Sequence, residues 1–225
     1  MRILGFNGSP RKAWNTARLL EKALEGAASR GASTSLAHLY DLDFKGCRSC
    51  FGCKIKGGPS YGSCASLDGL TPVLEQVRHA DALLLGSPIY FWAITGEMKS
   101  FLERLLFPYY RYVKADDPVQ TLFPRRIPVG FIYTLGANEA RMRQFGYDQA
   151  IGLNEMFLRR AFGPVESLES FDTWQFEDYS RIDQDRFDLA AKRAWREEQF
   201  PKDLENAFQL GIRLAEGKVG AAAGA

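Results

Sequence analysis

RILGFNGSPRKAWNTARLL, residues 2–20, joins a short apolar strand to an amphipathic helix through a turn of small and polar residues. Arg2–Phe6 forms the predicted strand, and apolar residues then recur every three or four positions, which predicts a helix from about Asn15 to Arg30. Because the first backbone N–H groups of a helix have no partner within it, this turn favours an anion. The segment therefore predicts a strand–turn–helix unit with a phosphate site. The alternative is a plain turn in which Asn15 caps the helix.

The side chains of this turn also suit a phosphate. They supply hydroxyl, amide and cationic groups from Ser9, Arg11, Lys12, Asn15 and Thr16. No Gly-Lys-Ser/Thr sequence follows, so the turn is not a Walker loop, and the chain contains no Gly-x-Gly-x-x-Gly for a resident dinucleotide. We therefore expect the ligand to be a mononucleotide.

The rest of the chain alternates apolar strands with amphipathic helices, which is typical of a doubly wound parallel sheet. Further strands are predicted at Ser33–His38, Ala82–Leu85, Ile127–Thr134 and Val165–Leu168, and further helices at Leu70–Ala80, from a Thr95 cap to Leu106, Tyr147–Ala161 and near Phe200–Glu216. This pattern predicts one three-layer α/β domain over residues 1–216, with a five-stranded parallel sheet of order 2-1-3-4-5. Residues 40–69 form a loop rich in Gly, Ser and Cys, and we expect residues 217–225 to be a disordered tail.

Composition excludes several classes of protein. A chain with 46% hydrophobic and 25% charged residues is neither disordered nor fibrous. The formal charge of +2 gives no electrostatic case for nucleic acid or an anionic membrane, and no apolar run is long enough to span a bilayer. The sequence enters a strand directly at Arg2 without the pattern of a signal peptide, so we expect a cytoplasmic protein.

Two further turns follow strands whose carboxyl ends meet the first turn at one edge of the sheet. The third strand ends in Gly86-Ser87-Pro88-Ile89-Tyr90-Phe91-Trp92, and the fourth in Tyr133-Thr134-Leu135-Gly136-Ala137-Asn138. Aromatic side chains at such an edge can wall a flat ring, and backbone amides can bind the edge of a heterocycle. The alternative is that the aromatic residues cover the core or a dimer interface.

Three motifs together resemble the NAD(P)H-dependent FMN reductase branch of the flavodoxin-like proteins. They are GSPR-x-x-x-NT at 8–16, GSPIYF at 86–91 and TG-x-MK-x-F-x-x-R at 95–104, and the likeness covers roughly residues 2–140. The resemblance implies that Ser9, Arg11, Asn15 and Thr16 hold the FMN phosphate. It also implies that Pro88, Ile89, Tyr90 and Phe91 flank the isoalloxazine, with Thr134, Leu135, Gly136 and Ala137 on its pyrimidine side. Trp14 stands where these relatives usually carry glycine.

The resemblance implies an FMN-dependent oxidoreductase that takes a hydride from NAD(P)H and reduces a quinone, a flavin or an iron–sulfur acceptor. Because the cofactor carries this chemistry, no catalytic acid or base is expected, and Tyr90 and Phe91 are expected to position the reactants. We expect a homodimer or homotetramer. Two alternatives remain open: an electron-transfer protein without its own small-molecule substrate, and a redox sensor based on thiols or zinc.

All four cysteines fall in the 40–69 loop, as Cys47-x-x-Cys50-x-x-Cys53 followed by Cys64. Ferredoxins use the same triple spacing to hold iron–sulfur clusters. The arrangement also resembles the iron–sulfur flavoproteins, although the ten residues between Cys53 and Cys64 exceed the usual gap in that group. A [4Fe–4S] cluster, a structural zinc ion, and free or redox-paired thiols all remain open as interpretations.

Other charged residues are expected at the surface. The alternating charges of residues 181–199 predict a solvated face. Surface positions are also expected for Arg141, Arg143, Arg159 and Arg160, one of which could meet the phosphates of a nicotinamide dinucleotide. Lys99 and Arg104 are expected to serve subunit contacts.

Overall fold

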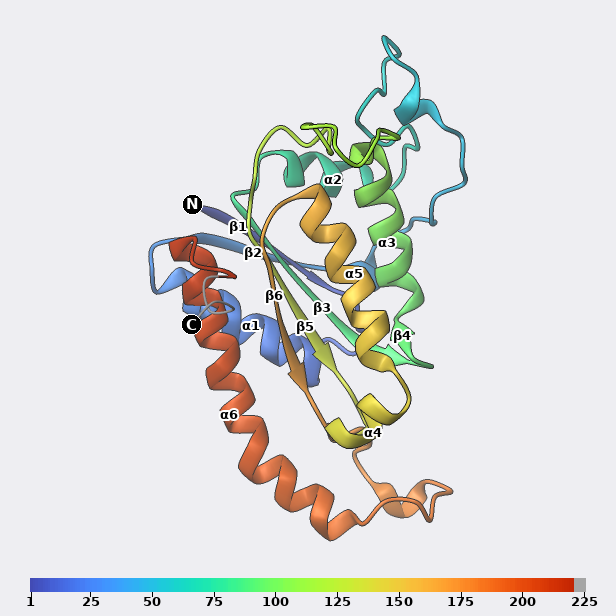
Figure 1. Ribbon diagram of the computed structural model, residues 1–225. Helices are drawn as coiled ribbons and strands as arrows, with labels where there is room; N and C mark the ends of the chain where they lie inside the picture. The colour runs from blue at the N-terminus through green and yellow to red at the C-terminus, as the bar shows by residue number, and fades with distance from the viewer. Residues whose placement is uncertain (221–225) are drawn as a thin grey trace.

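The computed structural model describes residues 1–220, whose long strands form one parallel sheet of order β2-β1-β3-β5-β6 (Figure 1). The bounds are β1 Arg2–Asn7, β2 Ser33–His38, β3 Ala82–Tyr90, β5 Val129–Thr134 and β6 Val165–Ser170. β1 pairs with β2 and β3 on its two sides, so that Gly5 faces both Leu36 and Leu84. This confirms the predicted order of the parallel strands.

The sheet also has a sixth strand that the sequence did not predict. β4, Ala93–Ile94, pairs antiparallel with the end of β3, with Ile89 opposite Ile94. Phe91 and Trp92 adopt left-handed conformations, with φ of 47° and 68°, and so reverse the chain between the two strands. β3 therefore continues to Tyr90, beyond its predicted end at Leu85.

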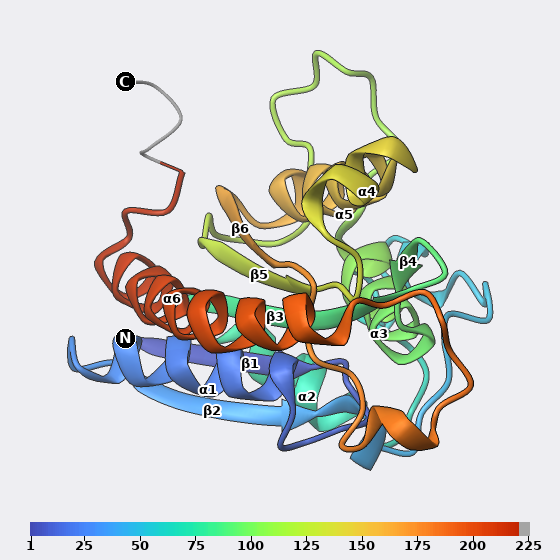
Figure 2. The same ribbon diagram turned by 90° about the horizontal axis from the view of Figure 1, so that it is seen from below.

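Helices cover both faces of the sheet, which makes the domain three-layered (Figures 1 and 2). One face carries α1 (Asn15–Ala28) and α6 (Leu189–Glu216), and the other carries α2 (Thr71–Arg78), α3 (Gly96–Leu106) and α5 (Tyr147–Ala161). A short α4, Glu139–Gln144, was not predicted and begins where Asn138 Oδ1 accepts from Arg141 N. Within residues 1–220, no helix combines the length and the apolar character needed to cross a bilayer.

α1 and α6 lie side by side with their backbones in contact (Figure 2). A Cβ atom at Gly211 would lie 1.7 Å from Ala23 O, and one at Gly26 would lie 2.0 Å from Phe208 O. Only glycine permits this approach, because a real Cβ atom does not come so close to a backbone oxygen. The packing fixes the second half of α1 against α6.

α6 begins at Leu189, well before its predicted start near Phe200. Asp188 caps it, with Oδ1 accepting from Ala191 N at 3.0 Å. Residues 189–199 carry Lys, Arg and Glu side chains in close succession, which is why their charge pattern predicted a solvated face. After α6, Val219 is buried against the core of this face, and residues 221–225 of the predicted tail lie outside the described residues.

Candidate functional site

A cavity of about 630 Å³ opens at the carboxyl ends of the central strands. The turn after β3, the turn after β5 and the connection from β6 into α6 bound it. Its wall is part aromatic and part backbone, with several cations at the rim. The residues are Ile89, Tyr90, Phe91, Leu135, Gly136, Ala137, Asn138, Arg141, Tyr147, Asp172, Gln175, Arg186, Phe187, Asp188, Ala191 and Lys192.

The aromatic turn after β3 presents its rings outward. Phe91 is 94% exposed, and Trp92 packs edge-on against Tyr147 at 5.5 Å between ring centroids. Thr95 ties this turn to its neighbours: its backbone N donates to Ser87 Oγ at 3.0 Å, and its Oγ1 donates to Gly8 O at 2.7 Å. Thr95 also caps α3 as predicted, accepting from Met98 N. One residue thus fixes the turns after β1 and β3 relative to each other.

The turn after β1 ends in an uncapped helix. Trp14 occupies the N-cap position of α1 and makes no capping hydrogen bond from its side chain. Asn15, the alternative cap, is instead the first helical residue. The first N–H groups of α1 therefore point out of the helix without a side-chain acceptor, which suits an anion.

The polar side chains of this turn are buried. Ser9 Oγ accepts from Arg11 N at 3.2 Å, and the hydroxyls of Thr16 and Thr134 share a hydrogen bond of 2.8 Å. Asn15 is also largely buried. The structure brings Thr134 to the turn after β1 rather than to the wall of the cavity.

Residues 172–176, between β6 and α6, lie across the turn that follows β1. Arg11 Nη1 donates to Gln175 O at 2.6 Å, and Asn15 Nδ2 donates to Trp174 O at 2.8 Å. The guanidinium of Arg11 also stacks over the ring of Trp14 at 3.3 Å. Trp14 therefore supports Arg11, although the family resemblance pointed to glycine at this position.

Three arginines gather beside the first turn of α1 without a carboxylate partner. Within residues 1–220, none of Arg11, Arg18 and Arg196 forms an ion pair. Burial, together with the neighbouring charge of Arg18, lowers the pKa of Arg196 to about 10, against a weaker opposing effect of Asp203. Uncompensated positive charge at a helix N-terminus fits an anionic ligand.

The cavity has room for a flat ring such as that of FMN, and the uncapped start of α1 suits its phosphate. The predicted ring-binding residues Ile89, Tyr90, Phe91, Leu135, Gly136 and Ala137 all line the cavity, whereas Pro88 and Thr134 do not. The predicted phosphate residues Ser9, Arg11, Asn15 and Thr16 lie outside the cavity, and Arg11 and Asn15 are held by the 172–176 segment. Whether these residues bind FMN stays a prediction.

Sequence reasoning missed the part of the cavity that comes from the β6–α6 connection. Lys192 is buried, and its Nζ donates to the carboxylate and carbonyl of Asp172 and, at 3.5 Å, to Gly136 O. The prediction of a solvated face for residues 181–199 was wrong for this residue. The only sequence signal was Asp188, a favoured helix cap directly before Leu189.

The four cysteines line a second, much smaller cavity of about 20 Å³ beside the end of α3. Cys53 is buried and Cys50 is exposed. Burial raises the pKa of the Cys53 thiol, and the charges of Cys64, Cys47 and Cys50 raise it further, against the opposing charge of Lys54. The hydrogen bond from Gly52 N–H lowers the pKa of Cys50.

The donor set of this second cavity fits a soft metal centre. Four thiols suit either an iron–sulfur cluster or zinc. Within the described residues, no group of three side chains is already arranged as metal ligands, and the cavity has room for about one water molecule. Ligation therefore requires the cysteine side chains to move closer together around the metal.

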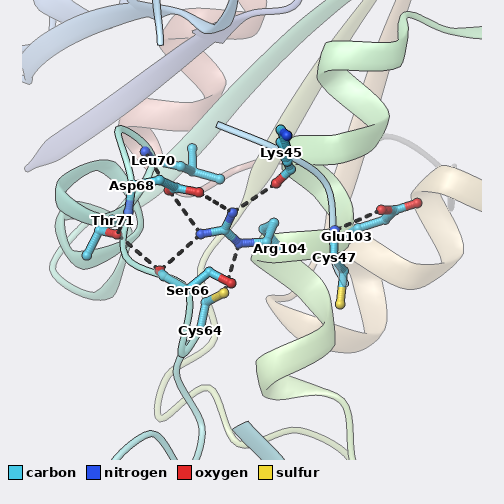
Figure 3. A network of polar contacts seen from close by, with 9 residues as sticks. All are labelled: Lys45, Cys47, Cys64, Ser66, Asp68, Leu70, Thr71, Glu103 and Arg104. Atoms are coloured by element: carbon cyan, nitrogen blue, oxygen red, sulfur yellow. Dashed lines mark hydrogen bonds and ion pairs between the residues drawn. The ribbon is translucent and has the colours of Figure 1, made fainter. Parts of the chain in front are cut away.

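Arg104 was expected in a subunit contact, and that prediction was wrong. Its side chain is buried and forms an ion pair with Asp68 at 2.7 Å (Figure 3). It lies against the cysteine loop rather than on the molecular surface.

Comparison with known proteins agrees with this arrangement. A family model described as NADPH-dependent FMN reductase matches residues 1–137. An iron-sulfur flavoprotein from Methanocaldococcus jannaschii is 30% identical over 138 residues, which are 61% of this chain and 63% of that protein. One from Archaeoglobus fulgidus is 38% identical over 104 residues, 46% of this chain and 48% of its own length. The matches thus span less than two thirds of these relatives.

Solved structures share the fold at low sequence identity. An NAD(P)H:quinone oxidoreductase from Methanothermobacter marburgensis gives a TM-score of 0.68 at 15% identity, covering 95% of this chain and 98% of that one. A flavodoxin from the domain Archaea gives a TM-score of 0.52 at 15% identity, covering 97% of this chain and 99% of that one. The fold is therefore flavodoxin-like, as predicted.

Proposed function

The chain belongs to the NADPH-dependent FMN reductase family, and on this basis we propose that it binds FMN and transfers electrons from NAD(P)H to a quinone, a flavin or an iron–sulfur acceptor. The observation that carries the proposal is the cavity of about 630 Å³ between the aromatic turn at Tyr90 and the backbone at Gly136. It lies beside an uncapped helix N-terminus, so a site for a flat ring adjoins a site for a phosphate.

The phosphate end of the proposed site uses the turn after β1. Ser9, Arg11, Asn15 and Thr16 would hold the phosphate, together with the free N–H groups at the start of α1. The absence of ion pairs at Arg11 within the described residues supports this role, because a dianion would supply the missing negative charge. Arg11 and Asn15 would exchange their contacts with Gln175 and Trp174 for contacts with the phosphate.

The ring end of the proposed site uses the turns after β3 and β5. Pro88, Ile89, Tyr90 and Phe91 would flank the ring, and Thr134–Ala137 would bind its pyrimidine side. When bound, FMN supplies the redox chemistry by accepting a hydride, which is two electrons and one proton, from reduced nicotinamide. Tyr90 and Phe91 are exposed at the mouth of the cavity and would orient the nicotinamide.

Because the proposed ring site opens into one cavity, both substrates would use the same site in turn. The oxidised nicotinamide would leave before the acceptor enters. A quinone acceptor would then take two electrons and two protons, one proton with the hydride and the other from solvent. The open mouth beside Phe91 allows this exchange. No side chain of the cavity is required as an acid or base, because the hydride passes directly between the two cofactors.

Anaerobic spectroscopy tests the proposal. We expect the purified protein mixed with FMN to retain a yellow flavin spectrum after gel filtration and to bleach rapidly with NADPH or NADH. Reoxidation by added quinone or free FMN would identify the class of acceptor. A protein that retains no FMN at micromolar concentration would contradict the proposal.

The cysteine loop favours a second candidate function, that of an electron carrier. Cys47, Cys50, Cys53 and Cys64 line one cavity and would hold a [4Fe–4S] cluster. The relatives named iron-sulfur flavoproteins support this candidate. Iron and acid-labile sulfide analysis of anaerobically purified protein tests it. A brown protein that NAD(P)H does not reduce, but a protein partner does, would favour the carrier over the reductase.

We further propose a homodimer or homotetramer. α5 exposes Leu153, Met156 and Phe157, and Phe157 lines one cavity with the aromatic residues Phe107, Tyr110 and Tyr112. Such apolar side chains suit burial by a second copy. Sedimentation equilibrium tests this, and a monomer at all concentrations would contradict it.

A further inference from the structure

The guanidinium of Arg104 joins the two ends of the cysteine loop (Figure 3). On the entering side, Nη1 donates to Lys45 O at 2.9 Å. On the leaving side, Nε donates to Cys64 Sγ at 2.8 Å and Nη2 donates to Ser66 O at 3.2 Å. One side chain of α3 therefore holds the loop just before its first cysteine and at its last.

The remaining donors of Arg104 pair with one carboxylate. Nη1 and Nη2 donate to Asp68 Oδ2 and Oδ1 at 2.7 and 3.1 Å. Every N–H group of the guanidinium is then used, and the side chain is only 2% exposed. Lysine could not replace it, because an ammonium group has fewer donors and no fork to reach Asp68 and Cys64 together.

The residue before Arg104 holds the first cysteine. Glu103 Oε2 accepts from Cys47 N at 3.2 Å (Figure 3). Neighbouring residues of one helical turn thus fix Cys47 and Cys64, which are the outer members of the cysteine series. The long gap between Cys53 and Cys64 consequently does not carry Cys64 away from the other thiols, and all four line one cavity.

We propose that Arg104 is the positioning residue of this site: it holds Cys64 as the fourth thiol ligand, so that the loop binds a soft metal through four cysteines rather than three. The inference rests on the proposed soft-metal role of the cysteines. It adds a residue outside the loop that determines how many thiolates the metal receives.

A double-mutant cycle on the full-length reduced protein tests the proposal, with Zn²⁺ and Co²⁺ as probes. Competition with a chromogenic chelator gives the Zn²⁺ affinity, and the intensity of the thiolate-to-Co²⁺ absorption reports the number of thiolates. We expect R104Q and C64S each to weaken Zn²⁺ binding at least about tenfold. The R104Q/C64S double variant should bind no more weakly than C64S alone, because Arg104 acts through Cys64.

Two further variants separate positioning from folding. K99Q removes an exposed cation from the same helix and should leave both probes unchanged. R104K keeps a positive charge beside Asp68 but has too few donors to hold Cys64 as well, so we expect its Co²⁺ spectrum to show three thiolates. A cooperative thermal unfolding transition of R104K shows that this change is not a loss of folding. If R104Q lacks a cooperative unfolding transition, the same cycle is run with R104K.

Several results would overturn the inference. Additive losses in the double variant would show that Arg104 does not act through Cys64. A wild-type Co²⁺ spectrum with three thiolates, or no binding of either metal, would show that Cys64 is not a ligand. A wild type that binds Zn²⁺ through four thiolates but assembles no cluster with iron and sulfide would refute the iron–sulfur carrier and leave this inference intact.

Discussion

Arg196 donates to Asn15 Oδ1 at 2.5 Å, which links α6 to the first turn of α1. The Arg196 guanidinium also lies 3.6 Å from the centre of the Phe200 ring, and no carboxylate pairs with it within residues 1–220. A cation held beside the proposed phosphate turn in this way should contribute to the binding of an anion.

The first prediction concerns this cation. R196Q should weaken FMN binding about fivefold, since one charge-assisted interaction is worth roughly 1 kcal/mol here. Riboflavin, which lacks the phosphate, should bind the variant and the wild type equally. Quenching of flavin fluorescence measures both affinities. K202Q, which removes an exposed cation of the same helix, is the control. Equal losses for FMN and riboflavin would contradict a phosphate contact.

The second prediction concerns the phosphate turn itself. Ser9→Ala combined with Asn15→Ala should weaken FMN binding at least about tenfold, or about 1.4 kcal/mol, because both side chains are expected to bind the phosphate. Riboflavin affinity should again stay constant in the same titration. Ser29→Ala, at the far end of α1, serves as the matched control. Unchanged FMN affinity in the double variant would refute this placement of the phosphate.

The third prediction concerns the contact between α1 and α6. Gly211→Ala should lower the free energy of unfolding by about 3 kcal/mol, because the new methyl group would meet Ala23 O and force the helices apart. Gly152→Ala is the matched control: it lies on α5 with no neighbour within 4 Å of the new methyl group. That change should stabilise the protein by about 0.5–1 kcal/mol. Urea unfolding followed by circular dichroism measures both, and equal effects would contradict the close packing.

The fourth prediction concerns pH. Burial raises the pKa of Glu169, and the charge of Glu155 raises it further, against the hydrogen bond from Ser167. A carboxyl whose pKa is raised by folding stabilises the protein below its ordinary value of 4.5 and loses that contribution as the pH rises through the folded value. The Glu169→Gln variant should therefore unfold at a higher urea concentration than the wild type at pH 7.

The same experiment at low pH provides the check. Near pH 4 the wild-type carboxyl is protonated, so the two midpoints should converge. If the difference between the two urea midpoints instead grew toward low pH, it would contradict a raised pKa for Glu169.

The sequence predicted the framework well because that framework follows local rules. Apolar runs bounded by Gly, Ser and Pro predicted the parallel strands and their order. The helical period of the apolar residues in 147–161 predicted α5 with both of its ends. Thr95 was predicted as a cap because its side chain acts three residues along the chain.

The residues that sequence reasoning missed act over long separations. Arg104 was assigned to the surface because arginine is rarely buried, and its partner Asp68 lies 36 residues earlier. Lys192 reaches Gly136, which is 56 residues away. No periodicity marks such contacts, since they depend on which loops the finished sheet brings together.

The contacts of Arg104 with both ends of the cysteine loop also have a consequence for how this chain could change during evolution. Both ends of the cysteine loop are fastened to one turn of α3, and within the loop Gly62 N donates to Cys53 O at 3.1 Å. Residues 55–61 therefore form a closed segment whose length is almost independent of the rest of the domain. Doubling the length of such a segment costs only about 0.6 kcal/mol in chain entropy. Insertions and deletions between Cys53 and Cys64 can therefore accumulate while the flavodoxin-like scaffold stays as it is.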